Sequence, residues 1–259
     1  MSKSELSSVL SIALLMAFRM LGMFMVLPIF ATAATHLQGS TPALIGLTLG
    51  IYGLTQAMLQ IPFGALSDKI GRKPIIAIGL VLLIIGSLIA AQAHSIYGVL
   101  LGRALQGAGA IGSTCLALLA DLTRDENRSK AMAMVGMMIG LSFSVAIVLG
   151  PMINHYFQLN GIFWTTAILG VLALCILLPS IAKPPRLTLA KHSENRLNRY
   201  RSVFSNTQLL RLNLGIFSQH AMLTSLFVIL PLLLTHSLGL TNHQQTLTYL
   251  LILSGAFIA

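Results

Sequence analysis

Long apolar segments alternate with short polar ones along this chain, at a spacing typical of membrane-spanning helices. A helix needs about 20 mostly apolar residues to cross the hydrocarbon layer of a bilayer. Eight segments meet this condition, at about 7–31, 42–66, 74–93, 96–121, 130–153, 162–182, 209–234 and 244–259. The pattern predicts an all-α polytopic membrane bundle of six helices, followed by a polar stretch, a seventh helix and the start of an eighth.

Three parts follow from this pattern. We expect a six-helix transmembrane bundle over residues 1–182, a basic cytoplasmic linker over 183–208, and helices 7 and 8 of an incomplete second bundle over 209–259. Within the polar stretch, apolar residues among arginines at 195–212 favour a short amphipathic helix on the membrane surface, although a solvated basic linker fits as well. Because the eighth apolar segment stops without a polar flank, we expect the chain to be the N-terminal part of a longer protein.

Basic residues fall in alternate loops. The basic loops hold Lys69, Arg72 and Lys73, then Arg124, Arg128 and Lys130, then residues 183–211, whereas the loops near 32–42, 92–97, 154–161 and 235–244 carry no formal charge. Cytoplasmic loops of membrane proteins are enriched in Lys and Arg. The alternation therefore predicts a multi-pass protein of the inner (plasma) membrane with a cytoplasmic N-terminus.

Composition supports the lipid bilayer as the main solvent of this chain. Hydrophobic residues make up 56% and charged residues 8% of the 259 residues, whereas soluble proteins average about a quarter charged residues. The net charge of +10 lies in short loops beside the membrane, without the interleaved aromatic residues of a nucleic-acid surface. We therefore expect no nucleic-acid partner.

Two arginines, Arg19 and Arg103, lie inside predicted spans. A charge within a bilayer is expensive and marks a functional candidate. We expect Arg19 to line a central cavity or to pair with a carboxylate or carbonyl group. Arg103 either faces the protein interior or snorkels to the outer surface. The spans also carry Gln56, Gln60 and Gln106, which we place with both arginines on a substrate or proton pathway.

Small residues four apart predict close contacts between helix backbones, as is common in membrane bundles. The glycines concerned are Gly46 and Gly50, Gly98 and Gly102, and Gly136 and Gly140, with Gly107 and Gly109 nearby.

The most specific pattern lies in the first basic loop, where residues 64–73 read GALSDKIGRK. Gly64 leaves room for a neighbouring helix, and Gly71 permits a tight backbone turn that a side chain would obstruct. Asp68 offers a carboxylate to a helix N-terminus or a cation, while Arg72 offers a two-pronged donor to a carboxylate. A loop that carried only topological charge would not need an acid and two glycines at these offsets.

This segment resembles the signature G-x-x-x-D-[RK]-x-G-R-[RK] of the major facilitator superfamily, in the expected loop. Residues 103–110, RALQGAGA, resemble the superfamily motif R-x-x-Q-G-x-G-A. Gly150 and Pro151 resemble the core of the motif associated with antiporters, with an ordinary proline kink as the alternative. The likeness covers nearly the whole chain and extends to YajR-type drug-efflux members. It implies twelve helices in two bundles, each bundle built from two inverted three-helix repeats, with substrate bound between them near the membrane midplane.

The resemblance also implies roles for single residues. Asp121 is expected to pair with Arg72, in a charge relay that closes the cytoplasmic side while the outside is open; alternatively, Asp121 caps its own loop near Arg124 or Arg128. Arg103 is linked with proton movement in proton-coupled members. The first seven predicted spans hold no central Asp or Glu, so a proton carrier would be His220, an acid at a span end, or an acid in the absent half. His220 equally reads as a hydrogen-bonded residue between helices.

We therefore predict a secondary active transporter that exports a small lipophilic solute in exchange for protons by alternating access, without a cofactor or a metal. A truncated, non-transporting membrane module and a superfamily transporter of sugars or metabolites are the alternatives. An in-frame continuation of the gene would favour the transporter over the module. An enzyme is not expected, because no metal-ligand cluster, nucleophile elbow or carboxylate pair is present in the sequence.

Overall fold

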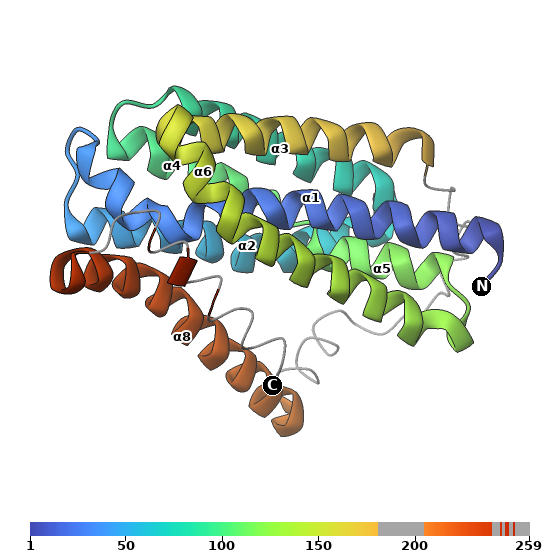
Figure 1. Ribbon diagram of the computed structural model, residues 1–259. Coiled ribbons are helices and arrows are strands. Elements are labelled where there is room, and N and C mark those ends of the chain that lie inside the picture. Colours follow the sequence, from blue (N-terminus) through green and yellow to red (C-terminus); the bar gives the residue numbers. More distant parts are fainter. Residues whose placement is uncertain (181–204, 240–243, 245–246, 249–250, 252–259) are drawn as a thin grey trace.

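The computed structural model describes residues 1–180 and 205–239, together with residues 244, 247, 248 and 251. Its elements are all helical (Figure 1). They are α1 (Lys3–Ala33), the 3-10 turn η1 (Ala34–His36), α2 (Pro42–Ile70), α3 (Arg72–Gln92), α4 (Ile96–Ala108), α5 (Gly112–Leu122), α6 (Asp125–Ser180) and α8 (Thr207–Leu238). The all-α prediction is confirmed. The expected linker over 183–208 and eighth span over 244–259 lie almost wholly outside the described residues.

Helix α6 makes two passes through the bundle. Gln158 has φ 59° and ψ −169°, which breaks the helical path at that one residue. From there the second half runs back in the opposite sense, and α1 is seen between the two halves (Figure 1). The expected fifth and sixth spans are therefore present, but the expected loop over 154–161 is wrong, because helical residues reach the break from both sides. Polar residues near the break, among them Asn154 and Gln158, line a hollow of about 670 Å³ together with His36 and His94.

The segment expected to be one helix over 96–121 is instead divided into α4 and α5. Gly109 ends α4 with φ −69° and ψ 48°, and Ala110 and Ile111 separate the two helices. Two causes combine: Gly107 and Gly109 are weak helix formers, and a Cβ added at Gly109 would overlap the carbonyl oxygen of Gly79 in α3. The chain thus unwinds at a glycine that contacts the backbone of another helix.

Side-chain caps and a glycine define several of the helix ends. Ser2 and Glu5 form a capping box at the start of α1: the Ser2 Oγ accepts from the Glu5 backbone N–H at 3.1 Å, and the Glu5 carboxylate accepts from the Ser2 N–H at 3.2 Å. Thr41 and Ser95 cap α2 and α4 with their hydroxyls. Gly71, with φ 108°, joins α2 to α3. This positive φ confirms that the turn needs a residue without a side chain.

The six passes form one bundle, in which each helix has one or two main neighbours. Helix α1 packs mainly against α6, α3 packs against α4 and α6, and α2 packs against α4. Helix α8 lies obliquely along one side (Figure 1) and contacts the bundle through Phe227 and Leu234, which pack on Ile147. The Phe227 ring meets the Phe143 ring edge-on, with centroids 5.9 Å apart.

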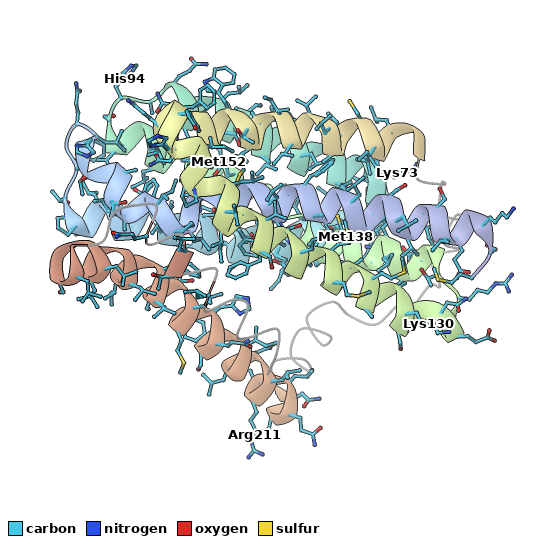
Figure 2. The ribbon with its side chains drawn as sticks, viewed as in Figure 1. Lys73, His94, Lys130, Met138, Met152 and Arg211 are labelled. Carbon is cyan, nitrogen blue, oxygen red and sulfur yellow. The ribbon has the colours of Figure 1, made fainter. Side chains whose placement is uncertain are left out.

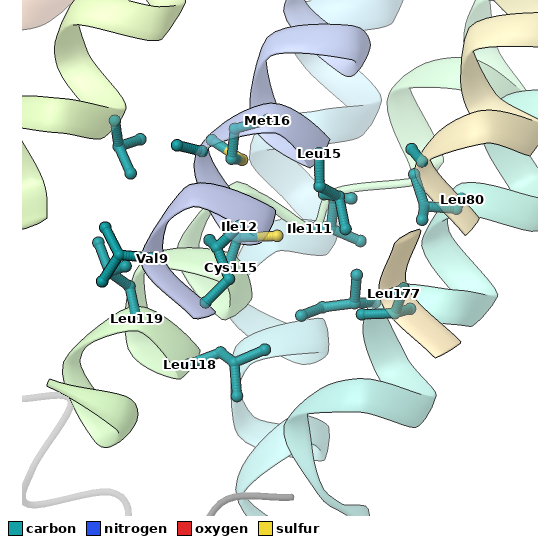
Figure 3. Packing of buried hydrophobic residues seen from close by; sticks show 14 of the residues in the cluster. Val9, Ile12, Leu15, Met16, Leu80, Ile111, Cys115, Leu118, Leu119 and Leu177 are labelled. Carbon is teal, nitrogen blue, oxygen red and sulfur yellow. The ribbon is translucent and has the colours of Figure 1, made fainter. Parts of the chain in front are cut away.

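Apolar side chains fill the interior and also cover the outside. Figure 3 shows one internal cluster, in which Val9 and Ile12 of α1 meet Leu118 of α5 and Leu177 of α6. Large apolar side chains also lie exposed on α2, α3 and α6, among them Leu54, Met58, Ile85, Met137 and Leu141. A water-soluble helix would show polar residues on its outer face. Five of the described helical segments, with α4 and α5 taken as one, are long and apolar enough to cross a membrane.

Apart from the buried Arg19 and Arg103, the charged residues of the six passes gather at one end of the bundle. Lys73 and Lys130 lie at this end, and His94 lies at the opposite one (Figure 2). We call the first the basic end; besides these two lysines it comprises Lys3, Lys69, Arg72, Arg124 and Arg128. We call the other the far end; it holds η1 and the turn at residues 93–95. There the backbone N–H of Gln38 donates to the His94 carbonyl, and that of Ile96 donates to the Gln38 carbonyl.

The glycines that bring backbones together are only partly those expected. A Cβ at Gly102 would lie 2.5 Å from the Gly86 carbonyl oxygen, and one at Gly107 would overlap the Tyr52 carbonyl oxygen. Among the described residues, nothing lies within 4 Å of a Cβ built at Gly46, Gly50, Gly136 or Gly140. The close contacts expected of these four are therefore wrong for this part of the chain, because they lie on helix faces that no described helix covers.

Candidate functional site

Arg72 joins three helices at the basic end. It is the first residue of α3, and its Nε donates to the Asp121 Oδ2 at 3.1 Å, near the end of α5. Its Nη1 donates to the Ser67 Oγ at 2.7 Å and pairs with the Asp68 carboxylate, both in the last turns of α2. The Arg72 side chain is 14% exposed and that of Asp121 18% exposed, whereas that of Asp68 is 56% exposed. One guanidinium thus holds two carboxylates from different helices, one sheltered and one open.

The contact expected between Asp121 and Arg72 is present. Of the alternative partners, Arg128 pairs with Asp125 at 2.7 Å, and the ion pair described for Asp121 is the one with Arg72. The turn itself is positioned by Gly71. A Cβ built at Gly64 would stand 3.8 Å from the Ser113 Oγ of α5, an ordinary contact, so the room that Gly64 leaves for a neighbouring helix stays a prediction.

Arg19 lies in the middle of α1 and is 1% exposed. Its Nη2 donates to the Tyr52 hydroxyl at 3.1 Å and to the Gln56 Oε1 at 3.0 Å. Both acceptors come from α2, one turn apart. The expectation that Arg19 meets a carbonyl group is thus met by the amide oxygen of Gln56.

Arg103 lies in α4 and is 2% exposed, so it does not snorkel to the surface. Its Nη1 donates to the Gln106 Oε1 at 2.9 Å, and the Gln106 Nε2 donates to the Ser87 Oγ at 2.8 Å in α3. Its guanidinium carbon lies 4.5 Å from the centre of the Tyr52 ring, which is a cation–π contact. Ser87 fixes the orientation of the Gln106 amide, so that its oxygen faces Arg103.

Tyr52 connects the two buried arginines, with its hydroxyl on Arg19 and its ring on Arg103. Sequence reasoning missed Tyr52 and Ser87 because both sit within apolar runs. A signal was available for Tyr52, since it lies four residues before Gln56 and so shares a helix face with it. We call Arg19, Tyr52, Gln56, Ser87, Arg103 and Gln106 the arginine network.

The arginine network has donors to spare and no acid. The hydrogen-bond acceptors of Arg19 and Arg103 among the described residues are a tyrosine hydroxyl and two glutamine amide oxygens. The Nε and Nη1 of Arg19 and the Nε of Arg103 are buried without a hydrogen-bond partner. Such unmatched donors are rare in folded proteins.

Close packing holds Tyr52 in place. A Cβ at Gly107 would overlap the Tyr52 carbonyl oxygen and the Thr55 Oγ1, so α4 and α2 touch backbone to backbone beside the arginines. Gly150 makes a similar contact between α6 and α1, where a Cβ would lie 2.6 Å from the Met25 carbonyl oxygen. Helix α6 continues through Pro151 to its break at Gln158.

The remaining candidates lie apart from the network. Gln60 is half-buried, one turn beyond Gln56. His220 is exposed on α8, and its Nδ1 lies 2.9 Å from the Ile216 carbonyl oxygen of the same helix. The structure thus joins His220 to neither arginine. Among the described residues, no group of three or more His, Cys, Asp or Glu side chains forms a metal site.

Glu5 is a further contact that sequence reasoning missed. Its carboxylate is buried at the basic end and accepts from the Arg124 backbone N–H and from the Asn127 side-chain amide. The contact ties the start of α1 to the start of α6. The S-x-x-E pattern at residues 2–5 signals the capping box of α1, but it does not signal the contact with α6.

Comparison with known proteins gives the family. The profile of the Major Facilitator Superfamily matches residues 12–259. The chain is 46% identical over 231 residues to the inner membrane transport protein YajR of Escherichia coli, covering 89% of this chain and 51% of that protein. It is 31% identical over 174 residues to the multidrug resistance protein MdtL of Klebsiella pneumoniae, covering 62% of this chain and 44% of MdtL.

The fold is shared with solved structures. A bacterial homologue of the human lysosomal transporter Spinster, in an inward-facing unoccupied conformation, superposes with a TM-score of 0.77 at 16% identity, covering 96% of this chain and 59% of that structure. The chain therefore spans about half the length of the relatives it matches. With the apolar helices, these matches make it a multi-pass membrane protein, and the chain belongs to the major facilitator superfamily.

Proposed function

We propose that this chain forms the first half of a secondary active transporter of the inner membrane, which exports a small lipophilic solute in exchange for protons. Membership of the superfamily supports transport, and the 46% identity to YajR, an inner membrane transport protein, supports the location. The likeness to MdtL, a multidrug resistance protein, favours efflux. The first bundle would comprise residues 1–182, and α8 would open the second.

The proposed orientation places the N-terminus and the basic end in the cytoplasm. The support is the distribution of Lys and Arg, because positively charged loops are retained on that side. The far end, with its uncharged loops, then faces the other side of the membrane. In this orientation the α2–α3 turn is cytoplasmic.

The observation that carries the proposal is the sharing of Arg72 by Asp121 and Asp68. Asp121 accepts a hydrogen bond from the Arg72 Nε and so holds the Arg72 guanidinium on the first bundle. Asp68 is more than half exposed and lies at the end of α2, so its carboxylate can meet a helix N-terminus of the second bundle. Making and breaking that contact would close and open the cytoplasmic side during alternating access.

The solute path would run past the arginine network, where the buried polar groups of the first bundle meet. Arg103 would take part in proton movement, as its place in the R-x-x-Q-G-x-G-A segment implies. The described spans hold no central carboxylate. The proton would therefore be carried by an acid at a span end, by His220, or by an acid beyond the described residues.

Transport in proteoliposomes with an imposed pH gradient tests this proposal. Solute-induced proton flux is measured with a trapped pH dye, for a panel of lipophilic cations, neutral compounds and anions. We expect flux with at least one class, and a reduction of about tenfold or more in Asp68→Asn, since a charge-assisted contact is worth about 1.5–3 kcal/mol.

Asp125→Asn is the matched control, because it removes an exposed acid that pairs with Arg128 at the same end of the bundle. It should transport like the unchanged protein. No flux with any compound would favour the non-transporting membrane module. Equal losses in Asp68→Asn and Asp125→Asn would reject the gate.

A further inference from the structure

The unmatched donors of the arginine network point to a ligand. Among the described residues, no acceptor meets the Nε and Nη1 of Arg19 or the Nε of Arg103, although both side chains are almost completely buried. Their acceptors on the described chain are neutral: a tyrosine hydroxyl and two glutamine amide oxygens. Two positive charges thus lie inside an apolar bundle without a negative charge from the described residues.

We propose that Arg19 and Arg103, on either side of Tyr52, bind the carboxylate of a small amphipathic organic anion. This inference rests on the proposed transport function and names the chemical class of its solute. A carboxylate supplies about four acceptor positions, which matches the unmatched N–H groups: one on each Nε and two on the Arg19 Nη1. It also supplies the charge whose absence makes two buried guanidinium groups costly.

The site is held ready for a ligand by its neighbours. The Tyr52 ring lies under the Arg103 guanidinium, and Ser87 holds the Gln106 amide with its oxygen toward Arg103. These contacts fix the plane of Arg103 yet leave its Nε unused. Preorganised donors of this kind strengthen binding, because less conformational freedom is lost when the ligand arrives.

The surface of α2 gives a route to the site. Gln56, which accepts from Arg19, is only half-buried, and its neighbours Gly53 and Ala57 are small and exposed. An incoming carboxylate would meet Gln56 first and replace its amide oxygen on Arg19. A charged acceptor makes a bond roughly twice as strong as a neutral one, so this exchange favours the ligand. The apolar body would rest on Gly53, Ala57 and the exposed Ile61.

Equilibrium binding of tritiated 1-naphthoate to the purified protein in phosphatidylcholine nanodiscs tests the inference. The isosteric competitors are 1-naphthalenemethanol, which is neutral, and 1-naphthylmethylammonium, which is a cation. We expect saturable binding of naphthoate, and displacement by unlabelled naphthoate but by neither isostere. Equal displacement by all three would overturn the proposal, because the site would then recognise only the apolar ring.

Substitution of the arginines locates the binding. Arg19→Gln and Arg103→Gln should each weaken naphthoate binding by about 10- to 100-fold, the loss expected for a hydrogen bond to a charged group. Arg211→Gln is the matched control, because it removes the same charge from an exposed position on α8, away from the bundle (Figure 2). Unchanged affinity in monodisperse samples of both network variants would overturn the proposal.

A conservative variant separates binding from folding. Arg19→Lys keeps the positive charge but loses the planar donor fork, so its affinity should fall between those of Arg19→Gln and the unchanged protein. If Arg19→Gln does not yield monodisperse protein, Arg19→Lys carries the test. Affinity in Arg19→Lys equal to that of the unchanged protein would then count against a carboxylate held by the fork.

Lipid and solute are distinguished by repeating the titration in phosphatidylglycerol nanodiscs. Competitive loss of naphthoate binding there would support the anion site and assign a lipid phosphate as its occupant; unchanged affinity would assign a soluble anion. The assay contains no proton gradient. Naphthoate binding without any transport would therefore reject the transport function alone, and transport without naphthoate binding would reject this site alone.

Discussion

Replacing Gly107 by alanine is the sharpest test of the packing around the arginine network. The added Cβ would overlap the backbone oxygen of Tyr52 and the Oγ1 of Thr55. The Thr55 side chain can rotate away, but the Tyr52 carbonyl belongs to the α2 backbone and moves only if the helix moves. Overpacking of this kind costs about 1–3 kcal/mol. For a chain of this size each kcal/mol corresponds to about 2–4 °C in Tm.

We therefore expect Gly107→Ala to lower the apparent Tm in nanodiscs by roughly 2–12 °C, from these two magnitudes. Because the displaced backbone carries Tyr52, naphthoate binding should weaken as well. Gly112→Ala is the matched control: it adds the same methyl group at the start of α5, where nothing lies within 4 Å. It should change neither quantity.

The double variant Gly107→Ala/Thr55→Ala divides the effect. It removes the side-chain overlap but keeps the overlap with the Tyr52 carbonyl, so it should recover only part of the lost stability. If Gly107→Ala has the Tm and the affinity of Gly112→Ala, α2 and α4 are not in backbone contact, and the described geometry of the network is wrong.

Three further predictions concern single contacts. Asp121→Asn leaves Arg72 bound to α2 but weakens its contact with α5 by about 1–2 kcal/mol. The population open to the cytoplasm should therefore rise about 5- to 30-fold, as measured by cysteine labelling at the basic end. An unchanged population would reject the charge relay between Arg72 and Asp121. Glu5→Gln should speed amide hydrogen exchange at Arg124 and the first turn of α6, while exchange in α3 stays the same. An equal change of the exchange rates in both regions would contradict a specific contact of Glu5 with the start of α6. Arg103→Met removes a buried charge, so we expect an unchanged or higher Tm together with loss of transport; a fall of many degrees would show that Arg103 is structural.

The sequence predicted the helices because apolar runs of about 20 residues leave few alternatives in a membrane. It also marked Arg19 and Arg103 as functional candidates, since a charge inside a span is expensive unless it meets a polar group or faces a cavity. The breaks at Gly109 and Gln158 were not predictable in this way. The first depends on the Gly79 backbone of another helix. For the second, hydropathy placed a reversal at 154–161 but not its form, a single residue of positive φ between helical segments.

The site was predictable to the extent that its residues are charged or carry an amide, because such side chains stand out in an apolar span. A motif with fixed offsets placed Asp68 and Arg72 in one turn, and the resemblance to the family added Asp121 as the expected partner of Arg72. The sequence did not give Tyr52 its place between the arginines, because an aromatic residue in an apolar run reads as packing. Glycine spacing was a poor guide as well: Gly102 meets Gly86 of another helix, while the similarly spaced Gly136 and Gly140 meet no described residue.

The central claim is that the basic end faces the cytoplasm, because the gate at Arg72 has its proposed role only there. Single cysteines at Lys130 and His94, at opposite ends of the bundle (Figure 2), are placed in a variant lacking Cys115 and Cys175 and treated with a membrane-impermeant maleimide. We expect Lys130→Cys to be labelled in inverted membrane vesicles and not in intact spheroplasts, and His94→Cys to show the reverse. Labelling of Lys130→Cys from outside intact spheroplasts would contradict the account.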